Sequence, residues 1–309
     1  MKRRFIVNPR ALSANKKAAS IAALRKYFRS AQNGNGNGDS DVDIVLPANA
    51  DAMTAAARAA IVDGIDQVVA VGGDGTVNAV AQGFFDEHGE PLAKSPTLAI
   101  APWGTGCDYF RGISRGVDWR HIVTSGKDQL VDVGQIVYRP SGTVRVFVNA
   151  ASLGMSSAVV RRQRAMPRWL PALASYSLPA LTTVLDYRAI ALTIKLDDQT
   201  LDAAFLAAFF LKGLYVGGGM RLGGAVARDD GKLDVTLLHA MGIGARLLRF
   251  GKIYTGKFHG DVKITKTIAK RISISAPVSQ PVEFDGEIFG VTAVEISVLP
   301  RALKIRVPI

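Results

Sequence analysis

The stretch Val68-Val69-Ala70-Val71-Gly72-Gly73-Asp74-Gly75-Thr76-Val77-Asn78 decides the fold of the first part of the chain. It predicts a buried strand, then a turn with three glycines in four positions, then the beginning of a helix. Glycines let the backbone approach a ligand closely, and the helix N-terminus adds partial positive charge. The segment therefore predicts a site for phosphate groups.

Asp74 lies inside this turn, where a bare carboxylate would repel phosphate unless a cation stood between them. Mg²⁺ is the natural cation for that position. The alternative is a structural turn in which Asp74 or Thr76 caps the helix. The motif lacks the Gly-Lys-Ser/Thr of Walker A and the spacing of the dinucleotide fingerprint, so neither of those sites is expected.

The flanking sequence alternates between strand and helix patterns. Strands are predicted over residues 4–7, 43–46, 67–71 and 97–101, and helices over residues 14–28, 50–63 and 76–85. Such repeated units predict an α/β domain with a parallel sheet and flanking helices. A second glycine turn, Trp103-Gly104-Thr105-Gly106-Cys107, follows the next strand and is expected at the same sheet edge as the first.

The second half of the chain has a different pattern, typical of a mostly antiparallel β domain. Strands are predicted over residues 131–137, 144–150, 190–196, 205–212, 233–238, 272–276, 294–299 and 303–307, with helices over 156–162 and 178–187. A chain of 309 residues suggests two cores. We expect one domain over residues 1–132, to which residues 300–309 can return, and a second over residues 133–299.

The net charge of +12 predicts an anionic partner, either nucleic acid, an acidic membrane surface or a phosphorylated ligand. No nucleic-acid-binding motif is found, so nucleic acid is not expected. A single cysteine, Cys107, fits a reducing, cytoplasmic location, and no histidine is placed by sequence to activate it as a nucleophile. The most apolar run, residues 203–211, is too short to span a bilayer, so membrane contact is expected to be peripheral, at the inner face.

Residues 161–171 combine four arginines with Trp169 and Leu170. Such a segment can lie on an anionic bilayer, with cations at the headgroups and the aromatic ring in the interface. A solvated basic loop whose tryptophan packs on the core explains the same residues equally well.

The two glycine turns together resemble the catalytic-domain signature of the diacylglycerol kinase family. More specifically, the chain resembles the soluble bacterial lipid kinases, which are related to sphingosine and ceramide kinases and, by fold, to NAD kinases. The resemblance extends along the chain through Val7-Asn8-Pro9, Asn149-Ala150-Ala151-Ser152-Leu153-Gly154, Gly217-Gly218-Gly219-Met220, Asp229-Asp230-Gly231-Lys232-Leu233-Asp234-Val235 and Phe284-Asp285-Gly286-Glu287.

This resemblance implies ATP and Mg²⁺ as cofactors and a lipid hydroxyl at a membrane surface as the phosphate acceptor. It implies that Asp74 reaches an active-site Mg²⁺ through water. It further places around the nucleotide Asn8, Gly72, Gly73, Gly75, Thr76, Asn78 and Thr105.

For the second half, the resemblance implies a structural Mg²⁺ held by the carboxylate of Asp230 and the carbonyls of Ala227 and Lys232. It also implies that Glu287 is the general base that takes the proton of the acceptor hydroxyl. From the residues alone, the Asp230 segment is an ordinary turn, and Asp285-Gly286 is a hairpin turn followed by a solvated Glu287.

Departures from the family pattern include Arg10-Ala11 in place of Ser-Gly, Ala79 in place of glutamate and Cys107 in place of asparagine. The expected function is transfer of the γ-phosphate of ATP to a diacylglycerol-like or related lipid. One alternative is a kinase of a soluble hydroxyl such as NAD. The other is a non-catalytic regulator that binds nucleotide or lipid, which these departures favour.

Overall fold

The computed structural model describes residues 1–11, 17–32, 42–104, 106–167, 172–257 and 260–309. The chain divides into two compact units. The first contains residues 1–86, 90–131 and 302–309, and the second contains residues 87–89 and 132–301.

The first unit contains a parallel sheet with the order β2 (Asp43–Val45), β1 (Arg3–Val7), β3 (Gln67–Gly72), β4 (Thr97–Pro102) and the last part of β17 (Val294–Val307). Its central strands are rich in valine, alanine and isoleucine, and every residue of β3 is buried. Burial on both faces is what a parallel sheet covered by helices requires.

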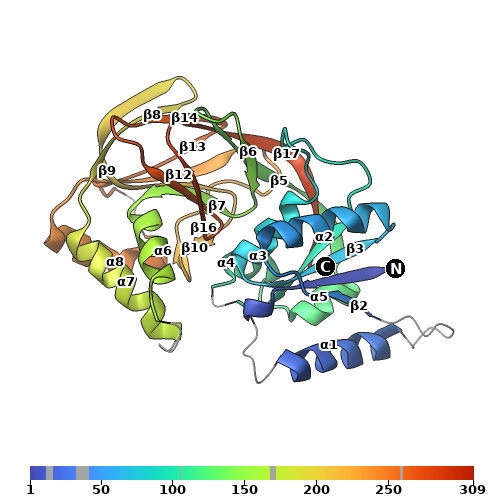
Figure 1. Cartoon of the computed structure of the whole chain (residues 1–309). Coiled ribbons are helices and arrows are strands. Elements are labelled where there is room, and N and C mark those ends of the chain that lie inside the picture. Colours follow the sequence, from blue (N-terminus) through green and yellow to red (C-terminus); the bar gives the residue numbers. More distant parts are fainter. Residues whose placement is uncertain (12–16, 33–41, 105, 168–171, 258–259) are drawn as a thin grey trace. The chain divides into compact units, whose positions relative to one another are not determined.

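Helices cover both faces of this sheet. On one face, α1 (Lys17–Gln32) and α5 (Trp119–Ser125) contribute Phe28 and Trp119 to a core with Phe5 and Val69. On the other, α2 (Ala50–Val62) packs against α3 (Asp74–Gln82), and Figure 1 shows both above strands β1 and β3 with α1 below. The short elements η1 (Pro9–Ala11) and α4 (Asp108–Ser114) follow β1 and the second glycine turn.

The second unit is β-rich, and the strand pairings of its described residues are antiparallel. The longest path through it runs β16 (Glu287–Val291), β15 (Pro281–Phe284), β7 (Ala150–Gly154), β9 (Gln199–Leu211), β8 (Ile190–Leu196), β14 (Arg271–Ser275), β17. Further strands are β5 (Lys127–Tyr138), β6 (Val144–Phe147), β10 (Tyr215–Val216), β11 (Met220–Arg221), β12 (Leu233–His239) and β13 (Ile264–Ala269).

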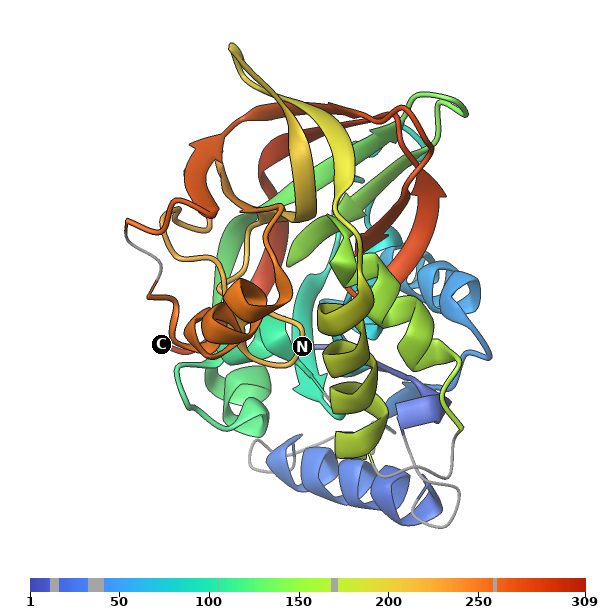
Figure 2. The same cartoon turned by 90° about the vertical axis from the view of Figure 1, so that its left-hand side faces the viewer.

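Strand β9 contributes to both apolar cores of this unit, because successive side chains of a strand point to opposite faces. Phe210 enters one apolar core with Phe147 and Leu153, whereas Phe209 enters a second core with Ile253. Ile253 belongs to α8 (Ile243–Thr255), which contacts α7 (Ala172–Asp186), and α7 in turn packs on α6 (Met155–Arg164). Figure 2 shows these three helices in green, olive and orange.

The predicted fold class, a parallel α/β domain followed by a mostly antiparallel β-rich domain, is confirmed. Several elements differ in detail. Helix α3 begins at Asp74 because Gly73 is its N-cap, and α4, α5 and α8 were not predicted. The predicted strands 294–299 and 303–307 are one strand, β17, which includes Pro300 and has a positive φ of 51° at Arg301.

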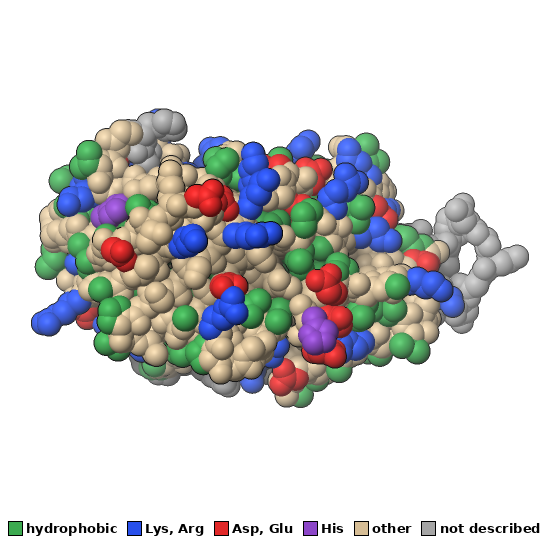
Figure 3. Space-filling view, turned by 90° about the horizontal axis from the view of Figure 1, so that it is seen from above, with side chains coloured by type: hydrophobic (Ala, Val, Ile, Leu, Met, Phe, Trp, Pro, Cys, Tyr) green, Lys and Arg blue, Asp and Glu red, His purple; other side chains and the backbone are tan. Residues whose placement is uncertain are grey.

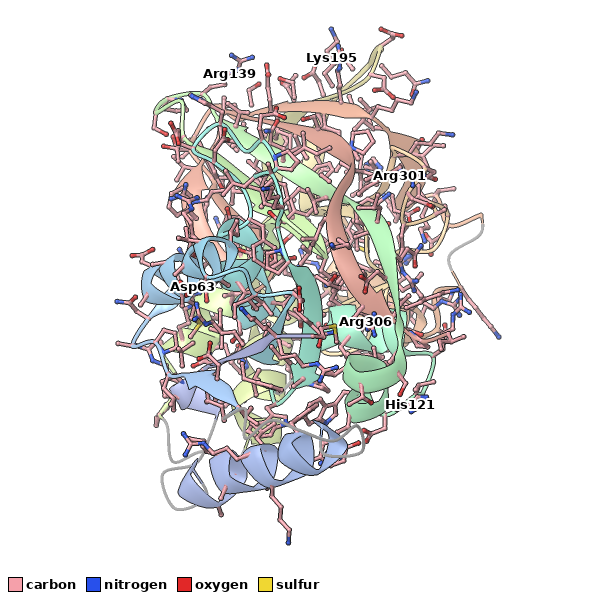
Figure 4. The ribbon with its side chains drawn as sticks, turned by 90° about the vertical axis from the view of Figure 1, so that its right-hand side faces the viewer. Asp63, His121, Arg139, Lys195, Arg301 and Arg306 are labelled. Atoms are coloured by element: carbon pink, nitrogen blue, oxygen red, sulfur yellow. The ribbon has the colours of Figure 1, made fainter. Side chains whose placement is uncertain are left out.

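Charged side chains of both signs are mixed on the face shown in Figure 3, where lysines and arginines lie among aspartates and glutamates. Arg301 and Arg306 lie along β17, as labelled in Figure 4, and Arg306 forms an ion pair of 2.8 Å with Asp128 in the first unit. Among the described residues, no helix has the length and apolar character needed to cross a membrane.

Candidate active site

The first glycine turn joins β3 to α3, and its tight geometry excludes side chains. A Cβ atom at Gly72 would lie 2.3 Å from the hydroxyl oxygen of Thr76, which is itself buried. The amide of Asn8 donates a hydrogen bond of 2.9 Å to the same hydroxyl. The structure therefore brings together Asn8, Gly72 and Thr76, three of the predicted nucleotide-binding residues.

The second glycine turn packs backbone to backbone against the first. A Cβ atom at Gly104 would lie 2.3 Å from the Cα atom of Gly73, so only glycine fits there. The N–H of Trp103 donates to the carbonyl of Gly72 at 3.1 Å. The parallel register of β3 and β4 places Gly72 opposite Pro102 and so sets this contact.

Asp74 connects the two turns through its side chain. Its carboxylate accepts the backbone N–H of Asp108 and of Tyr109, both at 3.0 Å, at the beginning of α4. Burial raises the pKa of Asp74 above its usual range, although these two amides oppose the shift. Because both oxygens already accept an amide, the arrangement fits contact with a cation through water better than direct ligation.

The remaining predicted nucleotide residues are placed as follows. Asn78 is buried in α3, where its side-chain oxygen accepts a hydrogen bond of 3.2 Å from Gln82. Gly75 lies in the first turn of α3, and Thr105 lies outside the described residues. Arg10, one of the departures from the family pattern, is exposed, and its N–H donates to the side chain of Asn8.

Cys107 has no features of a nucleophile. Burial, followed by the nearby carboxylates of Asp74 and Asp108, raises the pKa of its thiol to about 11. The thiol donates to the carbonyl of Gly104 at 3.3 Å. It stays protonated at neutral pH and helps to close the second turn.

In the second unit, the predicted general base Glu287 begins β16 directly after a hairpin turn. Its carboxylate is about half exposed and pairs with the guanidinium of Arg164 on α6. The same guanidinium donates to the carbonyl of Gly286 at 3.1 Å. Glu287 is therefore held in place at the surface, where a substrate can reach it.

The turn residue Asp285 is a buried anchor, not a solvated turn residue. Its carboxylate accepts the backbone N–H groups of Val148, Asn149 and Ala150 at 2.8–3.0 Å. With φ values of 47° and 86°, Asp285 and Gly286 form the two-residue turn that Asp-Gly favours. The hairpin expected from the residues alone is confirmed, and the three hydrogen bonds fix it to the first residue of β7 and the two residues before it.

Glu283 is a residue that the sequence analysis missed. Its carboxylate accepts hydrogen bonds from the hydroxyl of Ser152 and, at 2.7 Å, from the N–H of Gly286. Burial raises the pKa of Glu283 to about 7, and the neighbouring Asp285 and Glu287 add to the shift. Such a carboxyl is protonated about half the time near neutral pH. In the hairpin, Glu283 pairs with Ile288, the residue after Glu287. The only sequence signal was its position in the Glu-x-Asp-Gly-Glu segment.

The predicted structural metal site has another occupant. The carboxylate of Asp230 and the carbonyls of Ala227 and Lys232 do converge, as predicted, but they converge on the ammonium group of Lys212. Burial opposes the shift, but the amide of Ala227 and this ammonium hold the pKa of Asp230 below its usual range. The residues present therefore do not fit a structural Mg²⁺ at this loop.

Comparison with known proteins agrees with this architecture. Residues 2–136 match the family model described as diacylglycerol kinase catalytic domain. Residues 149–307 match the model described as YegS C-terminal NAD kinase beta sandwich-like domain.

Two curated relatives cover most of the chain. A probable lipid kinase YegS-like of Pectobacterium atrosepticum is 28% identical, over 79% of this chain and 78% of its own. A diacylglycerol kinase of Bacillus subtilis is 25% identical over 82% of both chains. The crystal structure of a diacylglycerol kinase from Bacillus anthracis has the same fold, with a TM-score of 0.71, 22% identity and coverage of 99% and 96% of the two chains. The chain therefore belongs to the diacylglycerol kinase catalytic-domain family of lipid kinases.

Proposed function

We propose that this protein transfers the γ-phosphate of ATP to a hydroxyl group of a diacylglycerol-like lipid. The observation that carries the proposal is the backbone contact between the two glycine turns, at the carboxyl ends of β3 and β4. That edge, together with the N-terminus of α3, offers backbone N–H groups and partial positive charge to a polyphosphate. Family membership supports lipid as the acceptor class.

Each unit would supply different groups for the transfer reaction. The glycine turns of the first unit would bind ATP, with Asp74 facing its cation through water. Mg²⁺ bound with ATP supplies charge neutralisation at the phosphates. In the second unit, Glu287 would accept the proton of the lipid hydroxyl, since it is exposed and held by Arg164. Glu283 would position Glu287 by holding the Gly286 amide in the turn between them.

The test is transfer of label from γ-labelled ATP to a mixed lipid extract in detergent micelles. Glu287→Gln should lower turnover by roughly 100-fold or more, the range for loss of a general base. Glu295→Gln is the matched control, because Glu295 is similarly exposed and also pairs with an arginine, Arg139. Equal activity of the two variants would remove Glu287 from the mechanism.

Wild-type protein that binds ATP but labels no lipid would contradict the kinase proposal and favour a regulator. Label that appears in NAD and not in lipid would favour the soluble-hydroxyl alternative. Both alternatives are therefore resolved by the same assay with two acceptors.

Exposed leucines on α7 and α8 support a membrane as the source of the substrate. Leu178, Leu181 and Leu185 follow one face of α7, and Leu247 and Leu248 are exposed on α8, which contacts α7. This apolar face lies in a chain of net charge +12, as binding to an anionic bilayer requires.

The membrane contact is tested by sedimentation with phosphatidylglycerol vesicles. The double variant Leu178→Gln, Leu181→Gln should weaken binding by roughly 10- to 100-fold, since each leucine is about half exposed and so can gain only about half of its apolar transfer free energy in the bilayer. Val278→Gln, which replaces an exposed residue of the same unit in the loop between β14 and β15, should bind like wild type. Unchanged binding of the double variant would contradict this contact.

A further inference from the structure

The ammonium group of Lys212 lies at the centre of a cage of oxygen atoms in the second unit. Lys212 follows directly after β9, and its side chain is 2% exposed. Its Nζ atom lies 2.9 Å from Asp132 Oδ2 and 3.2 Å from Asp230 Oδ1. It also lies 2.8 Å from the carbonyl oxygen of Ala227 and 2.9 Å from that of Lys232.

This oxygen set is of the kind that binds a hard divalent cation. Carboxylates and backbone carbonyls are the ligands of Mg²⁺ and Ca²⁺ in proteins. The distances, however, are those of N–H···O hydrogen bonds and not the roughly 2.0–2.6 Å of metal–oxygen bonds. A metal ion at the centre would overlap the ammonium nitrogen, so the cage holds one cation or the other.

The two carboxylates are also held by backbone amides, so the cage is already assembled around the lysine. Asp132 accepts the N–H groups of Gly231 at 2.7 Å and Arg301 at 2.8 Å. Asp230 accepts those of Ala227 at 2.9 Å and Lys232 at 3.1 Å. Asp132 is buried, whereas Asp230 is partly exposed to solvent, and a buried carboxylate needs a nearby cation to offset its desolvation penalty. Lys212 supplies that charge from within the chain.

The cage is not shielded from dissolved metal ions, so shielding does not explain why it holds an ammonium group. A cavity of about 450 Å³ adjoins the loop and is lined by Asp229, Asp230, Gly231 and Lys270, among others. A dissolved metal ion can therefore reach Asp230, and it is the ammonium group that prevents binding.

We propose that Lys212 is a built-in cation that replaces a structural divalent metal in the second unit. The loop 227–232 and the strand β5 at Asp132 are joined by an ammonium group, and this unit keeps its fold without Mg²⁺ or Ca²⁺. The proposal concerns folding and cation binding, and it does not depend on the transfer reaction proposed above.

The first experiment uses wild-type protein without nucleotide. Its melting temperature should be the same in EDTA, in Mg²⁺ and in Ca²⁺. Mn²⁺ binding, measured by electron paramagnetic resonance, should not change between wild type and Asp230→Asn. A melting temperature that falls in EDTA, or a bound Mn²⁺ that Asp230→Asn removes, would overturn the proposal.

The second experiment opens the cage with Lys212→Ala. Removing one partner of a buried ion pair should lower the melting temperature in EDTA by roughly 10 °C, and added Mg²⁺ or Ca²⁺ should restore part of the loss. This variant should also gain one Mn²⁺ that wild type lacks. Lys270→Ala, which removes a lysine beside the same cavity but outside the cage, should gain none. If Lys212→Ala does not fold, the wild-type measurements still decide the question.

Discussion

In the first unit, Gly73 and Gly104 meet through their backbones, whereas in the second unit Asp285 and Asp132 gather backbone amides with their carboxylates. The first arrangement depends on the absence of side chains. The second depends on the presence of buried charge that is fully hydrogen-bonded. The two units should therefore respond differently to substitution: the glycine turns to added volume, and the carboxylate anchors to lost charge.

Added volume at Gly104 should have the largest effect. In Gly104→Val, the new Cβ atom would lie 2.3 Å from Gly73 Cα, and neither backbone can move without disturbing β3 or β4. We expect a loss of about 4 kcal/mol or more in the free energy of unfolding, beyond ordinary overpacking. Urea denaturation measures the loss, and ATP binding should disappear with it.

The control for this variant is Gly251→Ala in α8. No atom lies within 4 Å of a Cβ built at Gly251, so alanine should be neutral or should stabilise the helix by up to about 1 kcal/mol. If Gly104→Val is as stable as Gly251→Ala, the two turns do not pack as described.

Removal of the Asp285 carboxylate should have the second-largest effect on the free energy of unfolding. Asp285→Ala leaves the amides of Val148, Asn149 and Ala150 without their acceptor. At about 1 kcal/mol for each bond, the free energy of unfolding should fall by roughly 3 kcal/mol. Asp197→Ala is the comparison, because Asp197 also accepts two backbone amides but lies in an exposed turn where water can replace it. Equal losses in the two variants would show that burial of the Asp285 anchor adds nothing.

The same contrast explains what the sequence could predict. The glycine turns are local patterns, so the strand, the turn and the sheet edge follow from residues 67–109 and from strand spacing alone. The metal prediction at Asp230 found the right oxygen atoms but not their occupant. Lys212 and Asp132 are 80 positions apart, and no local pattern predicts that pair.

Glu283 was missed for a related reason. Its partner Ser152 is 131 positions away, and the pairing exists only because β15 lies beside β7. Helix α8 was missed because Gly244 and Gly251 weaken its helical pattern, and tertiary packing of Ile253 overrides that preference. Long-range burial, and not composition, therefore decided the elements that were not predicted.

Glu283 should make the stability of the protein depend on pH. Its pKa is raised from 4.5 to about 7, so folding takes up a proton between these two values. The free energy of unfolding should therefore fall as the pH rises from about 4.5 to about 7, by roughly 3 kcal/mol from this residue. Glu283→Gln should flatten that slope, whereas Glu90→Gln, at an exposed position, should leave it unchanged. Parallel slopes for wild type and Glu283→Gln would contradict the raised pKa.

The smallest effect on stability is expected at the surface ion pair between Arg164 and Glu287. Both side chains are about half exposed, and such pairs contribute less than about 1 kcal/mol. Arg164→Met should therefore melt like wild type but turn over lipid several-fold more slowly, because Glu287 loses the group that holds it. Arg139→Met breaks the equivalent pair with Glu295 and should change neither property. A large loss of stability in Arg164→Met alone would instead show that Arg164 anchors the hairpin through the Gly286 carbonyl. It would contradict the view that, in this unit, buried charges stabilise the fold and surface charges do not.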